Sequence, residues 1–249
     1  MCRPFPIRTP STPPNVPHLA TLRLWHTYAL PARANHWASG RSAMEMAKAW
    51  RCGIPPEVDE SLATTPFSAF VPESGCPESL SYFDERPGPR HHDLVVRGRI
   101  DRELALLDVE GKADEPFGSR LVGAVFGAGA PGERARVEEL SLAMFQRPPS
   151  DPDISPLRYQ LLYGVYATAH LARLEGRRKA VFLVHEFQNE TCSVANTQRN
   201  HDDLNDFLMQ LGVGGLGPGV SAVGPISTSG SWLTGVELWI ARALSWQGP

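Results

Sequence analysis

The sequence predicts an α/β protein with a mixed central sheet flanked by helices. Three observations support this fold class: strand-like runs over 93–100 and 104–113 form a hairpin, an amphipathic helix follows over 156–175, and a buried strand at 180–184 comes directly after it. A hairpin, a helix and a further strand place antiparallel and parallel neighbours in one sheet. The 249 residues, 42% hydrophobic and 20% charged, suffice for one domain, which we expect over 21–249.

The N-terminal segment 1–20 is predicted to be a disordered, proline-rich tail. It contains six prolines, each of which fixes φ and lacks a backbone donor: Pro4, Pro6, Pro10, Pro13, Pro14 and Pro17. The first helix is expected near Ser42, because Ser42 and Glu45 have the spacing of a capping box. The stretch 63–89 is rich in Pro, Ser and Gly and is predicted to be mainly a covering loop.

The two strands of the hairpin carry charged residues at one end. On the second strand, alternation places Asp108, Glu110 and Lys112 on the same face as two leucines. If an even number of residues, such as Asp101-Arg102, joins the strands, Asp93 lies opposite Glu110 and their side chains share a face; an odd loop places them on opposite faces. The hypothesis of a site therefore depends on the register of this hairpin.

The remaining elements are predicted from periodicity and from residues typical of helix ends. The helix after the hairpin should begin with Ser155 as N-cap and Pro156 in its first turn. Four other elements are expected, in chain order: a surface helix over 133–145, a helix over 201–211, a Gly-rich loop over 212–235 and a strand over 236–240 at the edge of the sheet.

Composition restricts the function classes. The formal net charge of -3 predicts no domain-wide basic surface, which disfavours a strong non-specific binder of nucleic acid without excluding binding at a local site. The four cysteines lie far apart without C-x-x-C spacing, which argues against a structural zinc site. Neither a secretory signal nor a membrane-spanning segment is apparent, so a cytoplasmic location without membrane partners is expected.

The charged end of the hairpin has the ligand types that a hard divalent cation prefers. Mg²⁺ or Mn²⁺ commonly takes one or two carboxylates together with waters and substrate phosphate, and Asp93 and Glu110 supply two carboxylates. The main-chain carbonyl of Gly111 is a candidate third oxygen ligand. Lys112 is a candidate for positioning or deprotonating water and for offsetting charge on a phosphate. By itself, a Glu-x-Lys pattern on a strand is usually a solvated cross-strand pair.

These residues resemble the PD-(D/E)XK nuclease superfamily, over roughly Ser42 to Val184. The resemblance implies a three-layer, restriction-endonuclease-like core in which Asp93 and Glu110 bind the metal and Lys112 is catalytic. It also assigns Glu45 to the optional glutamate of the first helix, although its place in a capping box is the simpler interpretation. His92 stands where the motif name has proline.

The long helix adds to the resemblance. Gln160 and Tyr163 have the spacing of the Q-x-x-Y element of RecB-like members, which implies that they, with neighbouring Arg158, contact nucleic acid or support the lysine. Arg177 and Arg178 are candidate phosphate contacts, although cations at a helix end also favour the macrodipole. The wider chain, including the run from Val109 to Lys112, also resembles an uncharacterised bacterial family without known activity.

The leading functional prediction is a Mg²⁺- or Mn²⁺-dependent nuclease that acts on nucleic acid, with DNA favoured over RNA. A homodimer is compatible with this function, because nucleases that cut both strands often act as dimers. The alternative is a catalytically inactive module on the same fold that binds nucleic acid or protein. A third reading, hydrolysis of a small phosphorylated metabolite, predicts a closed pocket instead of an open groove.

Overall fold

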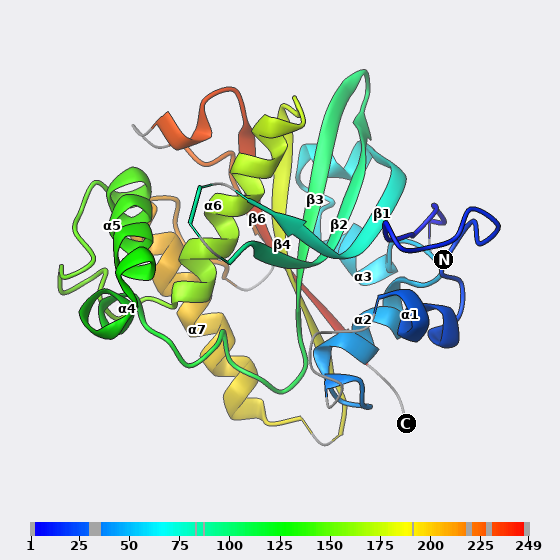
Figure 1. The fold of residues 1–249 in the computed structure, drawn as a ribbon, viewed down its shortest axis with the longest axis horizontal. Coiled ribbons are helices and arrows are strands. Elements are labelled where there is room, and N and C mark those ends of the chain that lie inside the picture. Colours follow the sequence, from blue (N-terminus) through cyan, green and yellow to red (C-terminus); the bar gives the residue numbers. More distant parts are fainter. Residues whose placement is uncertain are drawn as a thin grey trace.

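A six-stranded mixed sheet forms the centre of the protein (Figure 1). The computed structural model describes residues 3–29, 36–82, 84–86, 88–190, 192–217, 221–227 and 231–246. The strands are β1 (Phe70–Ser81), β2 (Arg90–Ile100), β3 (Glu103–Lys112), β4 (Lys179–Gln188), β5 (Ala222–Val223) and β6 (Glu237–Trp246), in the spatial order β1-β2-β3-β4-β6-β5. The pairs β3–β4 and β4–β6 are parallel and the others antiparallel, so the predicted mixed sheet is confirmed.

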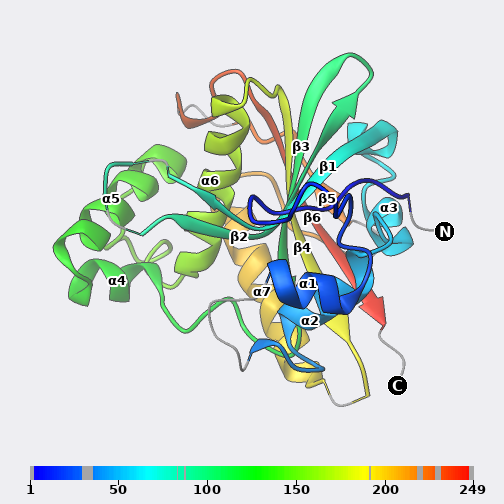
Figure 2. The same ribbon diagram turned by 45° about the vertical axis from the view of Figure 1, so that its right-hand side comes forward.

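Helices cover both faces of the sheet (Figures 1 and 2). One layer contains α6 (Tyr159–Leu174) and α7 (Val194–Gln210), with α4 (Val122–Ala128) and α5 (Pro131–Phe145) packed outside α6. The other contains α1 (Leu22–Tyr28), α2 (Ser42–Trp50) and α3 (Pro56–Ser61). Short 3-10 helices span Pro66–Ala69 and Ser231–Leu233. Alternate residues of each central strand enter separate cores, as Leu106 and Leu107 do on β3.

The hairpin between β2 and β3 has the even register on which the sequence hypothesis depends. Ile100 pairs with Glu103, which leaves Asp101 and Arg102 as a two-residue turn. Asp101 has a φ of 54°, the left-handed conformation that tight hairpin turns require. The ladder continues to the pair Leu94 and Val109. Asp93 and Glu110 are therefore the next residues on the two strands.

The N-terminal segment is extended and packed, so the prediction of a disordered tail over 1–20 is wrong for the described residues. Phe5, Ile7 and Leu19 are buried in the core that faces α2. The main chain is bonded to β1, since Gly75 N donates to Pro6 O at 2.8 Å and Gly75 O accepts from Arg8 N at 2.9 Å. The prolines exclude a helix here, but the apolar residues between them are removed from water by packing into this core, which orders the segment.

Other element boundaries also differ from the predictions. The supposed loop 63–89 contains the whole of β1, whose prolines are tolerated because the strand lies at the edge of the sheet. Helix α6 begins at Tyr159, after a turn that contains Pro156, and α7 begins seven residues before the predicted 201. Strand β6 lies between β4 and β5 instead of at the edge. The predicted Gly-rich loop contains β5 and the second 3-10 helix.

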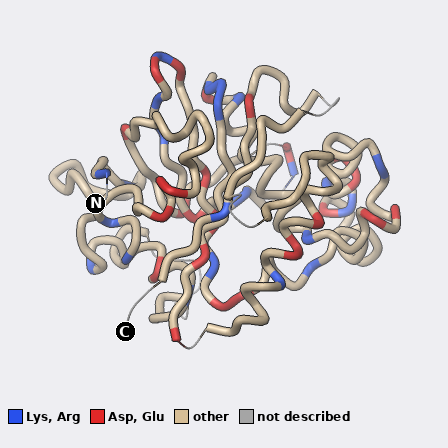
Figure 3. The backbone as a smooth tube through the Cα atoms, turned by 180° about the vertical axis from the view of Figure 1, so that it is seen from behind, with Lys and Arg blue, Asp and Glu red and all other residues tan. Residues whose placement is uncertain are grey.

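Two surface properties bear on function. Basic and acidic residues are interspersed along the backbone (Figure 3). None of the helices in the described ranges has both the length and the apolar content that crossing a membrane requires.

Candidate functional site

Glu110 and Lys112 lie side by side at the end of β3, on the face that α6 covers. Both are nearly fully buried, with 2% and 5% of their surface exposed, because β3 is central in the sheet. Lys112 Nζ donates to Glu110 Oε1 at 2.8 Å. The ammonium also lies 5.5 Å from the centre of the Phe117 ring. The Glu-x-Lys pair is thus a buried ion pair and not the solvated surface pair of the simpler interpretation.

Glu110 is the centre of this arrangement, because residues from three elements bind it. Arg90 Nη2, from β2, donates to Glu110 Oε2. Gln160 Nε2, from the first turn of α6, donates to Glu110 Oε1 at 2.5 Å. Burial alone would raise the pKa of Glu110, but the charges of Lys112 and Arg90 lower it to about 2. Glu110 is therefore ionised in the folded protein.

Asp93 of β2 contacts the main chain between Glu110 and Lys112. Its Oδ2 accepts a hydrogen bond from Gly111 N at 2.8 Å. Burial raises the pKa of Asp93 well above its usual value, and the charge of Glu110 raises it further. The charges of Lys112 and Arg90 lower this pKa, but they do not outweigh burial and Glu110. Gly111 packs closely against α2, because a Cβ there would lie 2.8 Å from the Met46 methyl carbon, which would have to move aside. Gly111 thus contributes its N–H to the site by binding Asp93.

A Mg²⁺ or Mn²⁺ ion fits the chemistry of these donors. Asp93 and Glu110 are hard oxygen ligands, and Gln160 Oε1 is a buried oxygen without a hydrogen-bond partner among the described residues. The described residues contain no group of three or more His, Cys, Asp or Glu arranged to hold a metal. A cation here would therefore rest on two carboxylates, with waters and substrate as further ligands, and Arg90 would have to release Glu110 Oε2.

Among the described residues, Glu45 of α2 forms neither the capping box with Ser42 nor a contact with the carboxylates of the site. Helix α2 begins at Ser42 itself after Arg41 as N-cap, so the predicted capping box is not formed. Glu45 Oε1 accepts from Gly40 N at 2.7 Å and from Lys48 Nζ at 2.8 Å, while its buried Oε2 has no partner. No interaction joins it to Asp93 or Glu110.

Tyr163 and Arg158 stand near Gln160 but bind elsewhere. Tyr163 Oη donates to Gly88 O at 3.0 Å, and its ring stacks on that of Tyr159 with centroids 5.6 Å apart. Arg158 Nε donates to Asp203 of α7 at 2.8 Å. Tyr163 therefore supports the segment that leads into β2, and Arg158 joins α6 to α7.

Arg177 and Arg178 lie at the opposite end of the sheet from Glu110. Arg177 Nη1 donates to Ala105 O at 2.9 Å, and Arg178 N donates to Leu104 O at 3.1 Å. Lys112 lies seven positions after Ala105 on β3, which is about 23 Å of strand. These arginines and the carboxylates therefore do not form one site.

Two residues that the sequence did not single out belong to the site by position. Arg90 binds Glu110, and Glu78 of β1 lies across from Asp93, between the pairs Pro77–Leu94 and Ser79–His92. Glu78 has a φ of 51°, and burial together with the charge of Glu110 raises its pKa to about 7. Neither residue could be found from periodicity, since Arg90 lies in a run of polar residues and β1 itself was not predicted.

A second buried network lies beside this site. His92 and Asp108 bind each other, with His92 Nδ1 2.7 Å from Asp108 Oδ2. Ser81 Oγ lies 2.7 Å from His92 Nε2, and Thr168 of α6 donates to Asp108. Arg97 and Arg99, further along β2, pair with Glu175 and Glu73, respectively. The network joins β1, β2, β3 and α6 beneath Glu110.

Comparison with known proteins identifies a family over most of the chain. A family model described as "Domain of unknown function (DUF6946)" matches residues 19–241. No curated protein and no solved structure matches the chain.

Proposed function

This chain belongs to the DUF6946 family, and we propose that it is a metal-dependent nuclease of the PD-(D/E)XK type that hydrolyses phosphodiester bonds in the cytoplasm. One observation carries the proposal: a carboxylate on β2, a Glu-x-Lys pair on β3 and a glutamine on α6 meet at one end of the sheet. Glu110 contacts both Lys112 and Gln160, and Asp93 lies against the backbone between Glu110 and Lys112. The resemblance in sequence assigned the same residues to a metal-dependent site.

Each side chain has a distinct part in this proposal. Asp93 and Glu110 would hold Mg²⁺ or Mn²⁺, which when bound would polarise the phosphate and acidify a water. Burial would lower the pKa of Lys112, but the charges of Glu110, Asp93 and Glu115 raise it above its usual value. Lys112 therefore stays protonated here, which favours stabilisation of phosphate charge over proton abstraction. Gln160 keeps Glu110 Oε1 in place through its amide N–H.

Arg90 adds a second positive charge beside the reacting position. Its guanidinium binds Glu110 Oε2 and is nearly fully buried. When a cation takes this oxygen, the five-donor guanidinium is free to bind a phosphate oxygen. The site would then contain two protein cations and a metal ion around an anionic substrate.

The test is cleavage by purified protein of single- and double-stranded DNA and RNA with Mg²⁺ or Mn²⁺. We expect cleavage, of DNA in preference to RNA, that falls by about 10³-fold or more in Glu110→Gln, because several kcal/mol of transition-state stabilisation are lost. Glu103→Gln is a matched control on the same strand, since Glu103 lies at its other end. Absence of cleavage on every substrate, with no Mn²⁺ binding by calorimetry, would refute the proposal. Sedimentation of the active species tests for a homodimer.

The second candidate is a binding module without catalysis, acting on nucleic acid or protein. It is favoured by the occupation of both Glu110 oxygens by protein donors, which leaves the buried charges balanced without a metal. This function predicts no Mn²⁺ binding and unchanged partner binding in Lys112→Ala. Loss of partner binding in Arg158→Gln, relative to Arg99→Gln, would support it.

A further inference from the structure

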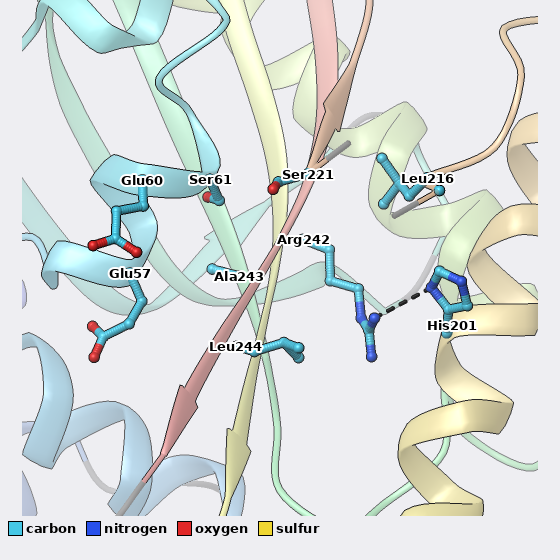
Figure 4. A pocket seen from close by; sticks show the side chains of 10 residues that line it. Glu57, Glu60, Ser61, His201, Leu216, Ser221, Arg242, Ala243 and Leu244 are labelled. Carbon is cyan, nitrogen blue, oxygen red and sulfur yellow. Dashed lines mark hydrogen bonds between the residues drawn. The ribbon is translucent and has the colours of Figure 1, made fainter. Parts of the chain in front are cut away.

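A cavity of about 320 Å³ lies away from Glu110, between α3, α7 and β6. Small-molecule sites begin at about this size. Figure 4 shows Arg242 of β6 and His201 of α7 directed toward each other on one side of the cavity, with Glu57 and Glu60 of α3 on the other side of β6. The cavity is thus lined by basic groups at one end and acidic groups at the other.

His201 lies between two groups that both donate hydrogen bonds. Asn205 has a defined orientation, because its Oδ1 accepts from Leu216 N at 2.7 Å and its Nδ2 donates to Leu216 O at 3.2 Å. The same Nδ2 lies 3.0 Å from His201 Nε2. On the other side, Arg242 Nη1 lies 3.2 Å from His201 Nδ1. Both ring nitrogens therefore face an N–H group.

A neutral imidazole can accept only one hydrogen bond at its ring nitrogens, because the other nitrogen carries a proton. In one of these two contacts, the N–H group of the imidazole therefore faces the N–H group of its neighbour. Arg242 Nε is also buried without a partner among the described residues, while Nη2 is bound by Glu186 Oε2 at 2.7 Å. Around the partly buried His201 ring, two N–H donors therefore face a single acceptor, while the nearby buried oxygen Glu186 Oε1 also has no partner among the described residues.

We propose that this cavity binds a small carboxylate whose oxygens accept hydrogen bonds from Arg242 Nη1 and from His201 Nδ1–H. With the ligand bound, His201 keeps one tautomer: Nε2 accepts from Asn205 and Nδ1 donates to the carboxylate. The N–H groups on both sides of the His201 ring then have an acceptor. A single negative charge suits the cavity better than a doubly charged phosphate, because Glu57 and Glu60 line the cavity and Glu186 already pairs with Arg242. The site is separate from the proposed nuclease centre.

The tautomer of His201 provides a direct test. Protein with ¹⁵N-labelled histidine is titrated with sodium acetate, against sodium chloride at equal ionic strength, and the His201 ring nitrogens are followed by NMR. We expect a saturable change that ends with Nδ1 protonated and Nε2 unprotonated. Inorganic phosphate should bind more weakly than acetate; tighter binding of phosphate would overturn the assignment to a carboxylate.

A variant of the arginine tests the contact itself. Arg242→Lys keeps the charge beside Glu186 but loses the Nη1 donor, and we expect acetate to bind about tenfold more weakly or worse. Arg99→Lys is the control, since Arg99 makes an exposed ion pair with Glu73. Equal binding by wild type and Arg242→Lys would overturn the proposal. If Arg242→Lys does not fold, the wild-type titration decides alone, because His201 signals that do not saturate with acetate refute the site.

Discussion

Acidification below about pH 6.5 should destabilise this protein through His185. The side chain, on β4, is completely buried. Trp50 Nε1 lies 3.0 Å from His185 Nδ1, and an indole N–H can only donate, so Nδ1 accepts and carries no proton. Nε2–H is then the donor to Ser245 Oγ at 2.7 Å. A proton on Nδ1 would face the indole N–H, and burial lowers the pKa of His185 to about 3.

The sign and size of the effect follow from the two protonation states. The ordinary pKa of 6.5 applies to the unfolded chain, so below that pH the unfolded state takes up a proton that the folded state refuses. The stabilisation is complete above pH 6.5 and is lost as the pH falls toward 3. Each pH unit corresponds to about 1.4 kcal/mol, so the loss between about pH 6.5 and about pH 4.5 is about 2.7 kcal/mol.

Urea unfolding at about pH 7.5 and about pH 4.5 measures this loss. The comparison is with His185→Gln, whose amide can donate to Ser245 but does not titrate. Asp93, Glu78 and Glu186 have raised pKa values and act in the opposite direction, but they are common to both proteins and cancel in the difference. A wild type that loses no more stability on acidification than His185→Gln would refute the reasoning, as would an imidazole that NMR shows to be protonated at about pH 5.

Three further predictions test the packing and the electrostatics of the site. Gly98→Ala should lower the free energy of unfolding in urea by about 3 kcal/mol or more, because its Cβ would lie 2.2 Å from Val71 O. Gly127→Ala in α4, where nothing lies within 4 Å of the new Cβ, should be neutral or stabilising, and equal effects of the two substitutions would contradict this packing. Glu78→Gln should raise the free energy of unfolding above about pH 7, because the raised pKa of Glu78 means that the folded state disfavours the charged carboxylate. The difference from wild type should disappear on acidification, and urea unfolding at several pH values measures it. Without metal, Arg90→Gln should lower the free energy of unfolding by about 3 kcal/mol, because Glu110 loses a buried ionic partner. Mn²⁺ should raise the melting temperature of Arg90→Gln more than that of the wild type, because the substitution frees an oxygen of Glu110; an equal rise in both proteins would exclude competition between Arg90 and the metal.

The parts of the fold that the sequence predicted depend on neighbouring residues. The β2–β3 hairpin follows from the alternation of its residues, whereas the choice between an even and an odd turn was decided by the pairing of Ile100 with Glu103. The proximity of Glu110 to Lys112 follows from the two-residue period of a strand. By contrast, β1 was missed because its prolines and glycine hide the alternation, and only its place at the edge of the sheet makes them acceptable.

By itself, the sequence determined the α/β class and which residues of β3 share a face, because both depend on the local geometry of the backbone. Only the tertiary structure decided which side chains meet there. Arg90 and Gln160 reach Glu110 from a strand start and a helix start 70 residues apart, and His92 reaches Asp108 instead of solvent. Arg177 and Arg178, equally plausible in sequence, lie at the far end of the sheet. Such contacts depend on how the layers pack, and periodicity along the chain contains no information about distances between layers.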